Sequence, residues 1–199
     1  PVVEAIAQRF DTIISVDTST PEVIRGAAQL GAGMINDVRA LSRPGALGAA
    51  AASGLPVGLM HMQGEPSSMQ PSYQNIFEEV AAFLRGRVAA CLAAGIAKDQ
   101  LLLDPGFGFG KTTEHNFELF RRLPDFVEMG FPLLVGVSRK SMLGAITGRA
   151  VEERMAASIA MAAMAVERGA HIIRVHDVKE TVDAVKLATA VKFEKTNNG

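Results

Sequence analysis

Short apolar runs alternate along the chain with longer amphipathic segments. Six of these runs are too short for helices and are rich in leucine or β-branched residues without strict alternation, which is typical of strands covered on both faces. The segments between them have helical periodicity, most clearly over residues 74–94 and 178–192. The pattern predicts an α/β fold with strands at residues 12–16, 34–35, 56–60, 100–103, 132–137 and 171–175.

Glycines mark the boundaries of this repeating unit. A glycine follows a helical segment and precedes a strand at five places, where a left-handed helix cap is wanted and carries no Cβ penalty. At the opposite helix end, hydroxyls at Thr18, Ser19 and Thr20 precede Pro21, which predicts a capped helix start with proline in the first turn. The pattern predicts parallel strands joined by right-handed helical crossovers in a single domain, 1–199. The five glycines are Gly31, Gly54, Gly95, Gly130 and Gly169.

Polar residues at the strand ends favour a closed barrel over an open sheet. An open sheet uses a few strand ends where strand order reverses, whereas a barrel gathers residues from many strand ends around one mouth. We therefore expect a (β/α)8 TIM-type barrel. Only about six of its eight βα units are visible, and the chain begins inside an amphipathic segment, 1–10, so we expect the first two units to precede Pro1. The polar strand ends are Asp17, Asn36, Asp37, His61, Asp104, Ser138, Arg139, Lys140, Arg174 and His176.

The composition favours a globular protein and gives no support for binding to nucleic acid or a membrane. The 199 residues are 48% hydrophobic and 21% charged, with a net charge of −1, so no electrostatic case exists for nucleic acid or an anionic membrane. The apolar stretch 155–166 is shorter than the roughly 20 residues that cross a bilayer, which predicts a buried helix. The single cysteine, Cys91, is expected to be a buried hydrophobe in a reducing compartment. We expect a soluble, cytoplasmic protein.

The stretch 101–112 contains three glycines followed by Lys111 and Thr112, which invites comparison with a phosphate-binding P-loop. That motif needs a glycine five positions before Gly110, where Pro105 stands. The even glycine spacing also fails the dinucleotide-binding pattern. A turn alone does not explain why Asp104 ends an apolar strand. A buried carboxylate needs partners such as the paired N–H groups of a ligand.

Asp17, Asn36 and Asp104 offer acceptors and a donor at one barrel mouth. This set suits a flat heterocycle with a guanidine-like edge, such as a 2-amino-4-oxopyrimidine ring. An equal alternative for Asp17 is capping of the helix at Pro21.

Basic side chains are found at the last two predicted strands, with Arg174 and His176 on the last one. Arg174 and His176 lie two residues apart, so both are expected to point to one side and to form an anion site for phosphate or diphosphate. Lys140 is expected to bridge a ring carbonyl or hold a second substrate, while Arg139 is either a surface charge or functional. His61 is open between packing and ligand contact, and Met60 is expected to form a pocket wall.

Six ordered motifs are similar to those of the dihydropteroate synthase family, and the similarity covers the chain except residues 194–199. They are Ser15-Val16-Asp17-Thr18, Ile35-Asn36-Asp37, Leu59-Met60-His61-Met62, the stretch from Leu103 to Lys111, Val137-Ser138-Arg139-Lys140-Ser141 and Ile173-Arg174-Val175-His176-Asp177. The resemblance implies a barrel enzyme of folate biosynthesis. It would condense 6-hydroxymethyl-7,8-dihydropterin diphosphate with p-aminobenzoate, release diphosphate, and be a sulfonamide target.

The resemblance also implies roles for individual residues. Pterin binding is implied for Asp17, Asn36, Asp104 and Lys140, with Met60, Phe109 and Gly136 shaping the pocket. Ser141 and Lys140 would border the p-aminobenzoate site. Arg174 and His176 would hold the diphosphate, with which family members use Mg²⁺. The resemblance implies catalytic roles for Asp17, Lys140, Arg174 and His176. The expected partners are small molecules and a second copy of the chain in a homodimer.

Two segments of the family pattern do not occur in this chain. They are an Asn-containing loop and a Gly-Gly-Glu-Ser-Thr-Arg-Pro-like loop from the first two βα units, which help complete the p-aminobenzoate and diphosphate–metal sites. An inactive pterin-binding fragment is therefore one alternative. A pterin-dependent methyltransferase domain is another, although methyl transfer needs no diphosphate site.

Overall fold

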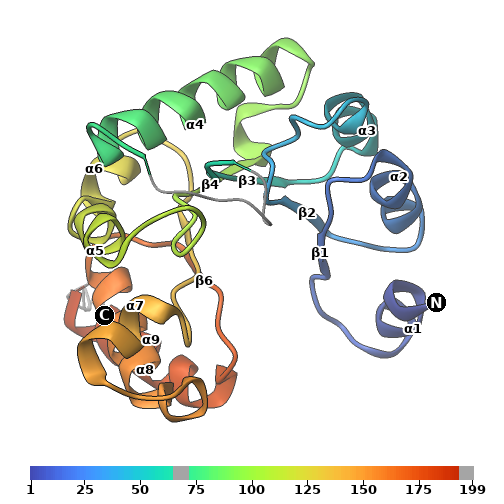
Figure 1. Ribbon diagram of the computed structural model, residues 1–199. Helices are drawn as coiled ribbons and strands as arrows, with labels where there is room; N and C mark the ends of the chain where they lie inside the picture. Colours follow the sequence, from blue (N-terminus) through green and yellow to red (C-terminus); the bar gives the residue numbers. More distant parts are fainter. Residues whose placement is uncertain (65–71, 193–199) are drawn as a thin grey trace, which may run out of the picture. The chain divides into compact units, whose positions relative to one another are not determined.

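The computed structural model describes residues 1–64 and 72–192 (Figure 1). The chain forms two compact units. Unit 1 comprises Pro1–Met62 and Glu78–Gly106, and unit 2 comprises Gln63–Phe77 and Phe107–Gly199. Both units combine parallel strands with helices that follow them in sequence.

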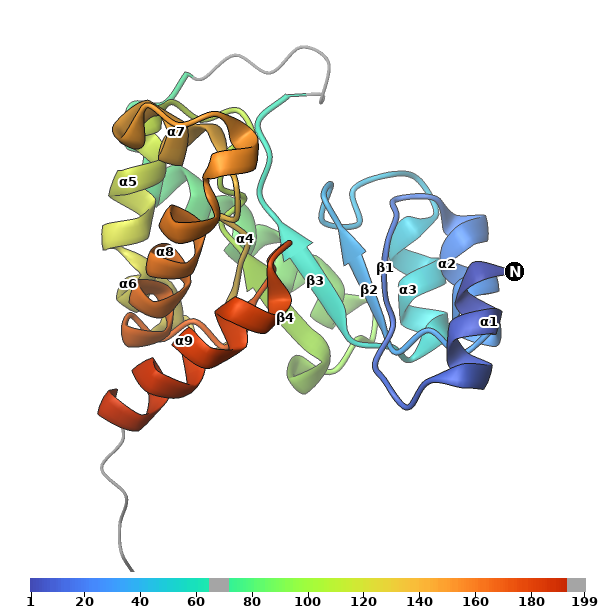
Figure 2. The ribbon, with the colours of Figure 1, turned by 90° about the horizontal axis from the view of Figure 1, so that it is seen from below.

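Unit 1 is built on a four-stranded parallel sheet of β1 (Ser15–Asp17), β2 (Met34–Asp37), β3 (Val57–Met60) and β4 (Leu101–Asp104). Each strand pairs with the next one along the chain. Figure 2 shows these strands side by side, with α2 and α3 along them. The helices are α1 (Val2–Arg9), α2 (Pro21–Gln29), α3 (Ala46–Ser53), most of α4 (Ile76–Ala93) and the 3₁₀ turn η1 (Lys98–Gln100).

Unit 2 contains a shorter parallel pair, β5 (Leu134–Val135) and β6 (Ile172–Ile173). Two long helices at its C-terminal end, α8 and α9, pack against each other (Figure 1). The helices are α5 (Thr113–Arg121), α6 (Leu123–Val127), α7 (Ser141–Thr147), α8 (Met155–Glu167) and α9 (Val178–Lys192), with the 3₁₀ turn η2 (Val151–Glu153).

Strand order agrees with barrel topology. In an open doubly wound sheet the order reverses at a switch point, whereas in a barrel each strand lies beside its successor. Within residues 1–64 and 72–192 every strand pair is parallel and joins two strands that are consecutive in the chain. The register places Asp17 opposite Asn36 and Met60 opposite Asp104. The carboxyl ends of the unit 1 strands, and the polar residues on them, therefore share one edge of the sheet.

The expected elements are confirmed, with shorter strands than the apolar runs suggested. Ile13, expected within the first strand, precedes β1 and is 81% exposed. All five boundary glycines have positive φ, as predicted. Pro21 occupies the first turn of α2, but the predicted hydroxyl cap is wrong, because Thr20 makes no side-chain capping bond. Instead the Thr20 hydroxyl oxygen accepts a hydrogen bond from Arg43 Nη1 at 3.0 Å.

Helix α4 shows how amphipathic spacing forms the core. Its buried residues recur three or four positions apart, so one face of the helix is apolar. Cys91 lies on this face as a buried free thiol, and burial raises its pKa. In the described part of the chain, no helix is both long and apolar enough to cross a membrane. The buried positions are Ile76, Phe77, Val80, Ala81, Leu84, Val88 and Cys91.

Candidate functional site

At the carboxyl end of the unit 1 sheet, Asp17 and Asn36 contact each other. Asn36 Nδ2 donates to Asp17 Oδ2 at 2.9 Å, so the predicted neighbours on β1 and β2 do meet. Asn36 is 3% exposed, and its Oδ1 finds no hydrogen-bond partner among the described residues. Glycine at position 58 makes room for this oxygen, because a Cβ there would lie 2.9 Å from it. A buried, unsatisfied acceptor is costly for a structural amide and indicates a group retained for binding.

The neighbouring residue Asp37 organises the loop after β2. Its buried carboxylate accepts the Ser19 hydroxyl and the N–H groups of Arg39 and Leu41, at 2.8 and 3.0 Å for the two amides. These bonds hold Ala40 and Leu41 at φ of 48° and 58°, a left-handed backbone that residues other than glycine rarely adopt. Asp37 therefore supports the loop that begins beside Asn36.

Asp104 ends β4 with its side chain 1% exposed. Its Oδ1 accepts the Gly106 N–H at 2.8 Å, and its carbonyl accepts the His61 N–H at 3.0 Å. Only glycine fits at position 106, because φ is +71° and a Cβ would lie 1.8 Å from the His61 carbonyl oxygen. His61 itself is buried and packs edge-to-face on Phe83, with ring centroids 5.0 Å apart, which favours the packing role. Met60 is fully buried.

In unit 2 the glycine-rich loop is shaped by hydrogen bonds that a P-loop would not make. Gly108 and Gly110 have φ of +80° and +61°. Thr112 caps α5 by accepting the His115 N–H at 3.2 Å, and Lys111 Nζ donates to the Phe109 carbonyl at 3.0 Å. The lysine and threonine of the apparent motif are thus engaged in local structure, which agrees with rejecting the P-loop.

Lys140 lies over this loop. Its Nζ donates to the Phe107 carbonyl and stands 4.2 Å from the centroid of the Phe109 ring. A Cβ at Gly108 would come 2.9 Å from Lys140 Cδ, so the glycine is needed for this approach. Predicted site residues Lys140 and Phe109 are therefore in contact.

Four predicted site residues of unit 2 line one cavity of about 230 Å³: Gly136, Lys140, Arg174 and His176, together with Ser138 and Val175. Arg174 lies against Gly136, where a Cβ would be 3.1 Å from the guanidinium nitrogens Nε and Nη2. Ser138 Oγ stands 2.9 Å from His176 Nδ1 and accepts the His176 N–H at 3.2 Å. The lining contains a guanidinium and an ammonium but no carboxylate, so the cavity is suited to an anion.

The position of Arg174 and His176 differs in one respect from the expectation. Strand β6 ends at Ile173, so both residues lie in the loop after the strand rather than within it. They still line the same cavity. Ser141, also predicted, is the exposed first residue of α7, directly after Lys140.

Arg139 is neither a free surface charge nor a lining residue of the cavity. It forms a two-atom ion pair with Asp177, with Nε 3.1 Å from Oδ2 and Nη2 bonded to Oδ1. The Arg139 hydrogen bond lowers the pKa of Asp177, while the same bond raises the pKa of Arg139. Sequence reasoning left Arg139 open and did not single out Asp177.

Asn116 and Ser158 are further residues that sequence reasoning missed. Asn116 is 2% exposed and holds the glycine-rich loop by accepting the Gly108 N–H at 2.7 Å. Ser158 is 1% exposed in α8. Both carried a usable signal, because each lies three and four positions before buried apolar residues of the same helix.

No group of three or more metal-ligating side chains that could hold an ion occurs in residues 1–64 and 72–192. The carboxylate nearest the anion cavity in sequence, Asp177, is engaged by Arg139.

Comparison with known proteins identifies the family. The model of the family described as "Pterin binding enzyme" matches residues 1–176. The dihydropteroate synthase of Escherichia coli K12 is 57% identical over 199 residues, which cover 99% of this chain and 71% of that protein. A Yersinia pestis dihydropteroate synthase solved with a sulfonamide drug is 52% identical with a TM-score of 0.95, covering 96% of this chain and 71% of its own. The Xanthomonas albilineans enzyme solved with 4-aminobenzoic acid is 49% identical with a TM-score of 0.92, covering 96% and 69%.

Parallel strands in chain order, polar strand ends and the family match define a pterin-binding enzyme of the (β/α)8 barrel class, as the sequence predicted. The chain belongs to the pterin binding enzyme family and, within it, to the dihydropteroate synthases, which are transferases of folate biosynthesis.

Proposed function

We propose that this chain binds 6-hydroxymethyl-7,8-dihydropterin diphosphate and p-aminobenzoate and joins them to give 7,8-dihydropteroate and diphosphate. The observation that carries the proposal is the cavity lined by Lys140, Arg174 and His176, whose charge suits a departing diphosphate. The relatives support it, including the Xanthomonas albilineans enzyme with 4-aminobenzoic acid. The chain spans 71% of the Escherichia coli relative, so the test must ask whether these residues suffice.

In unit 1, Asp17, Asn36 and Asp104 would bind the polar edge of the pterin ring. A carboxylate can accept up to about four hydrogen bonds, so Asp104 retains capacity beyond the Gly106 amide. The buried Asn36 Oδ1 is an acceptor for a ring N–H, and Asp17 adds a charge close to it. Met60, at the end of β3, would form a wall beside the ring.

In unit 2, Arg174 and His176 would hold the diphosphate. In the tautomer in which the Ser138 hydroxyl donates to His176 Nδ1, Nε2 carries the ring proton and can donate to an anion. Lys140 and Ser141 would border p-aminobenzoate, with Lys140 also contacting the pterin. Each role is consistent with the side chains that line the cavity or adjoin it.

The proposed reaction is a substitution at the pterin methylene carbon. The bond from this carbon to the diphosphate oxygen breaks, and its electron pair leaves with the diphosphate. The arylamine nitrogen of p-aminobenzoate then forms the new C–N bond and loses a proton to solvent. Arg174 and His176 stabilise the charge that develops on the leaving group, and Asp17 stabilises the electron-poor ring system.

We also propose that the protein uses Mg²⁺, is located in the cytoplasm and forms a homodimer. A Mg²⁺ ion would accompany the diphosphate and offset part of its negative charge. The buried free thiol of Cys91 is compatible with a reducing compartment.

The test combines calorimetric binding with product detection. Wild-type chain is titrated with a dihydropterin diphosphate analogue, and dihydropteroate formation is then followed with p-aminobenzoate present. We expect binding and product, and a loss of about 10²-fold in kcat/KM for Arg174→Ala. Arg25→Ala, which removes an exposed arginine from α2, is the matched control and should leave activity unchanged.

Other outcomes separate the alternatives. Pterin binding without product supports a pterin-binding fragment that lacks part of the catalytic surround. A folded chain that binds no pterin diphosphate analogue contradicts the assigned site.

A further inference from the structure

The loop that carries Ser138 and Lys140 has an unfavourable backbone at its centre. Arg139 adopts φ of 57°, a left-handed conformation that a bulky side chain rarely occupies unless its surroundings hold it there. Ser138 and Lys140, on either side, both line the anion cavity. The conformation of Arg139 therefore determines where two cavity residues point.

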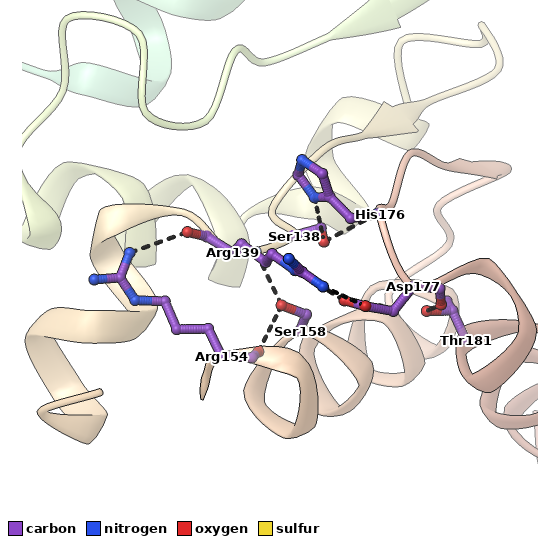
Figure 3. A network of polar contacts seen from close by, with 7 residues as sticks. All are labelled: Ser138, Arg139, Arg154, Ser158, His176, Asp177 and Thr181. Carbon is purple, nitrogen blue, oxygen red and sulfur yellow. Dashed lines mark hydrogen bonds and ion pairs between the residues drawn. The ribbon is translucent and has the colours of Figure 1, made fainter. Parts of the chain in front are cut away.

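The backbone of Arg139 is bound by residues at the start of α8. Its N–H donates to Ser158 Oγ at 2.9 Å, and its carbonyl accepts Arg154 Nη1 at 3.0 Å. Ser158 Oγ in turn donates to the Arg154 carbonyl at 2.7 Å, which closes the network at the start of α8. Figure 3 shows Ser158 between the Arg139 backbone and Arg154.

The side chain of Arg139 reaches the second loop of the site. Its guanidinium makes two bonds to the Asp177 carboxylate, directly after His176 (Figure 3). Asp177 is itself anchored, because its carbonyl accepts the N–H and the hydroxyl of Thr181 in α9, at 3.1 and 2.7 Å. The ion pair thus ties the loop after β5 to the loop after β6, where Ser138 and His176 meet.

We propose that Arg139 and Asp177 are a positioning pair that holds the anion cavity in its binding geometry, and that Ser158 fixes the backbone of Arg139. Neither charged side chain lines the cavity. The identity of the anion as a diphosphate rests on the proposed function, but the positioning role does not.

For substitution of Asp177, simple electrostatics and the positioning role predict opposite changes in anion affinity. Removing the Asp177 carboxylate beside an anion site lowers electrostatic repulsion and should tighten anion binding. Loss of positioning should weaken it, because Ser138, Lys140 and His176 no longer share one geometry.

The experiment is a calorimetric titration of folded chain with inorganic pyrophosphate. We expect Asp177→Asn to weaken pyrophosphate binding about fivefold or more, and Arg139→Gln to weaken it similarly. In the double variant the two losses should not add, because each substitution breaks the same pair. Asp183→Asn makes the same charge change at an exposed position of α9 and should not weaken binding. Pyrophosphate binding by Asp177→Asn that equals or exceeds that of wild type would overturn the proposal.

A milder variant tests the positioning role even if the stronger variants do not fold or the anion is not a diphosphate. Arg139→Lys keeps every charge but lacks the planar fork, so we expect a smaller loss of pyrophosphate affinity. It should also change the ¹⁵N resonance of His176 Nδ1, as the bond to Ser138 loosens. If wild type binds no pyrophosphate, the proposed diphosphate site fails, whereas an unchanged His176 resonance in Arg139→Lys refutes the positioning role.

Discussion

Individual side chains in this protein act mainly by holding loops in conformations that the backbone disfavours. Asp37 holds Ala40 and Leu41, Asn116 holds the glycine-rich loop, and Asp177 holds Arg139. In each case a side-chain oxygen accepts hydrogen bonds from a loop at the carboxyl end of a strand. The donors are backbone N–H groups for Asp37 and Asn116 and the Arg139 guanidinium for Asp177. The site therefore depends on residues that do not themselves face a ligand.

The Asp177 carboxylate provides a pH-dependent measure of one such contact. The Arg139 hydrogen bond, aided by attraction to Arg139 and His176 and opposed by desolvation, lowers its pKa below the ordinary value of 3.8. A carboxylate whose pKa falls on folding stabilises the protein above its unfolded pKa, and this stabilisation is lost as the pH falls through the folded pKa. Glu152 also faces Arg139 and supports its positive charge.

We therefore predict that Asp177 titrates below pH 3.8 in the wild-type chain. In Arg139→Gln its pKa should rise toward the ordinary value. The difference in free energy of unfolding between the two proteins should be constant near neutral pH and shrink below pH 3.8. Carboxyl ¹³C NMR titration measures the first effect and urea unfolding the second. A wild-type midpoint at or above 3.8 would contradict the ion pair.

Replacing glycine by alanine should change the stability in opposite directions at two positions of unit 1. At Gly106 an added Cβ would overlap the His61 carbonyl, and φ is +71°, so Gly106→Ala should lower the free energy of unfolding by about 2 kcal/mol or more. Gly86 lies within α4 with nothing within 4 Å of an added Cβ. Gly86→Ala should instead raise it by about 0.5–1 kcal/mol. Urea denaturation of both variants checks the pair of signs, and equal effects would refute the argument.

At the scale of the element, helix α4 is stabilised by the burial of the apolar side chains on one of its faces. Leu84 is 0% exposed, whereas Leu92, two turns further along the same helix, is 44% exposed. We predict that Leu84→Ala costs about 2–5 kcal/mol of unfolding free energy through lost burial and a residual cavity. Leu92→Ala, the matched control, should cost less than about 1 kcal/mol. Similar midpoints for the two variants in urea would show that the buried face has been misassigned.

Helices and strands were predictable to different extents. The helix from 178 to 192 and the left-handed glycines follow from local patterns, and the structure confirms them. Strand ends do not, because pairing register determines where a strand stops, and Ile13 lies outside β1 although it continues the apolar run. The Thr20 cap failed for a related reason, since its hydroxyl bonds to Arg43, which is 23 residues away in the chain.

At the scale of the whole molecule, the family and the barrel class were predictable because six motifs recur in order, each at a strand end. Within each unit the predicted strand-end residues do meet, as Asp17 meets Asn36 and as Arg174 and His176 share a cavity. Pairs such as Arg139 and Asp177 are 38 residues apart and depend on a left-handed backbone. No local sequence pattern encodes such a contact. The single-domain expectation stays a prediction beside the two compact units.

The cavity of unit 2 is held in shape by bonds within the chain, since Ser138 bonds to His176 and the Arg139 network fixes the loop that carries Ser138. A preformed site gives up little conformational freedom on binding and so binds whatever matches it. Under the proposed function, the diphosphate released in one turnover fits this cavity as well as the diphosphate of the next substrate does. Product inhibition is thus built into the architecture, and the net flux through the reaction would depend on how quickly other enzymes hydrolyse free pyrophosphate.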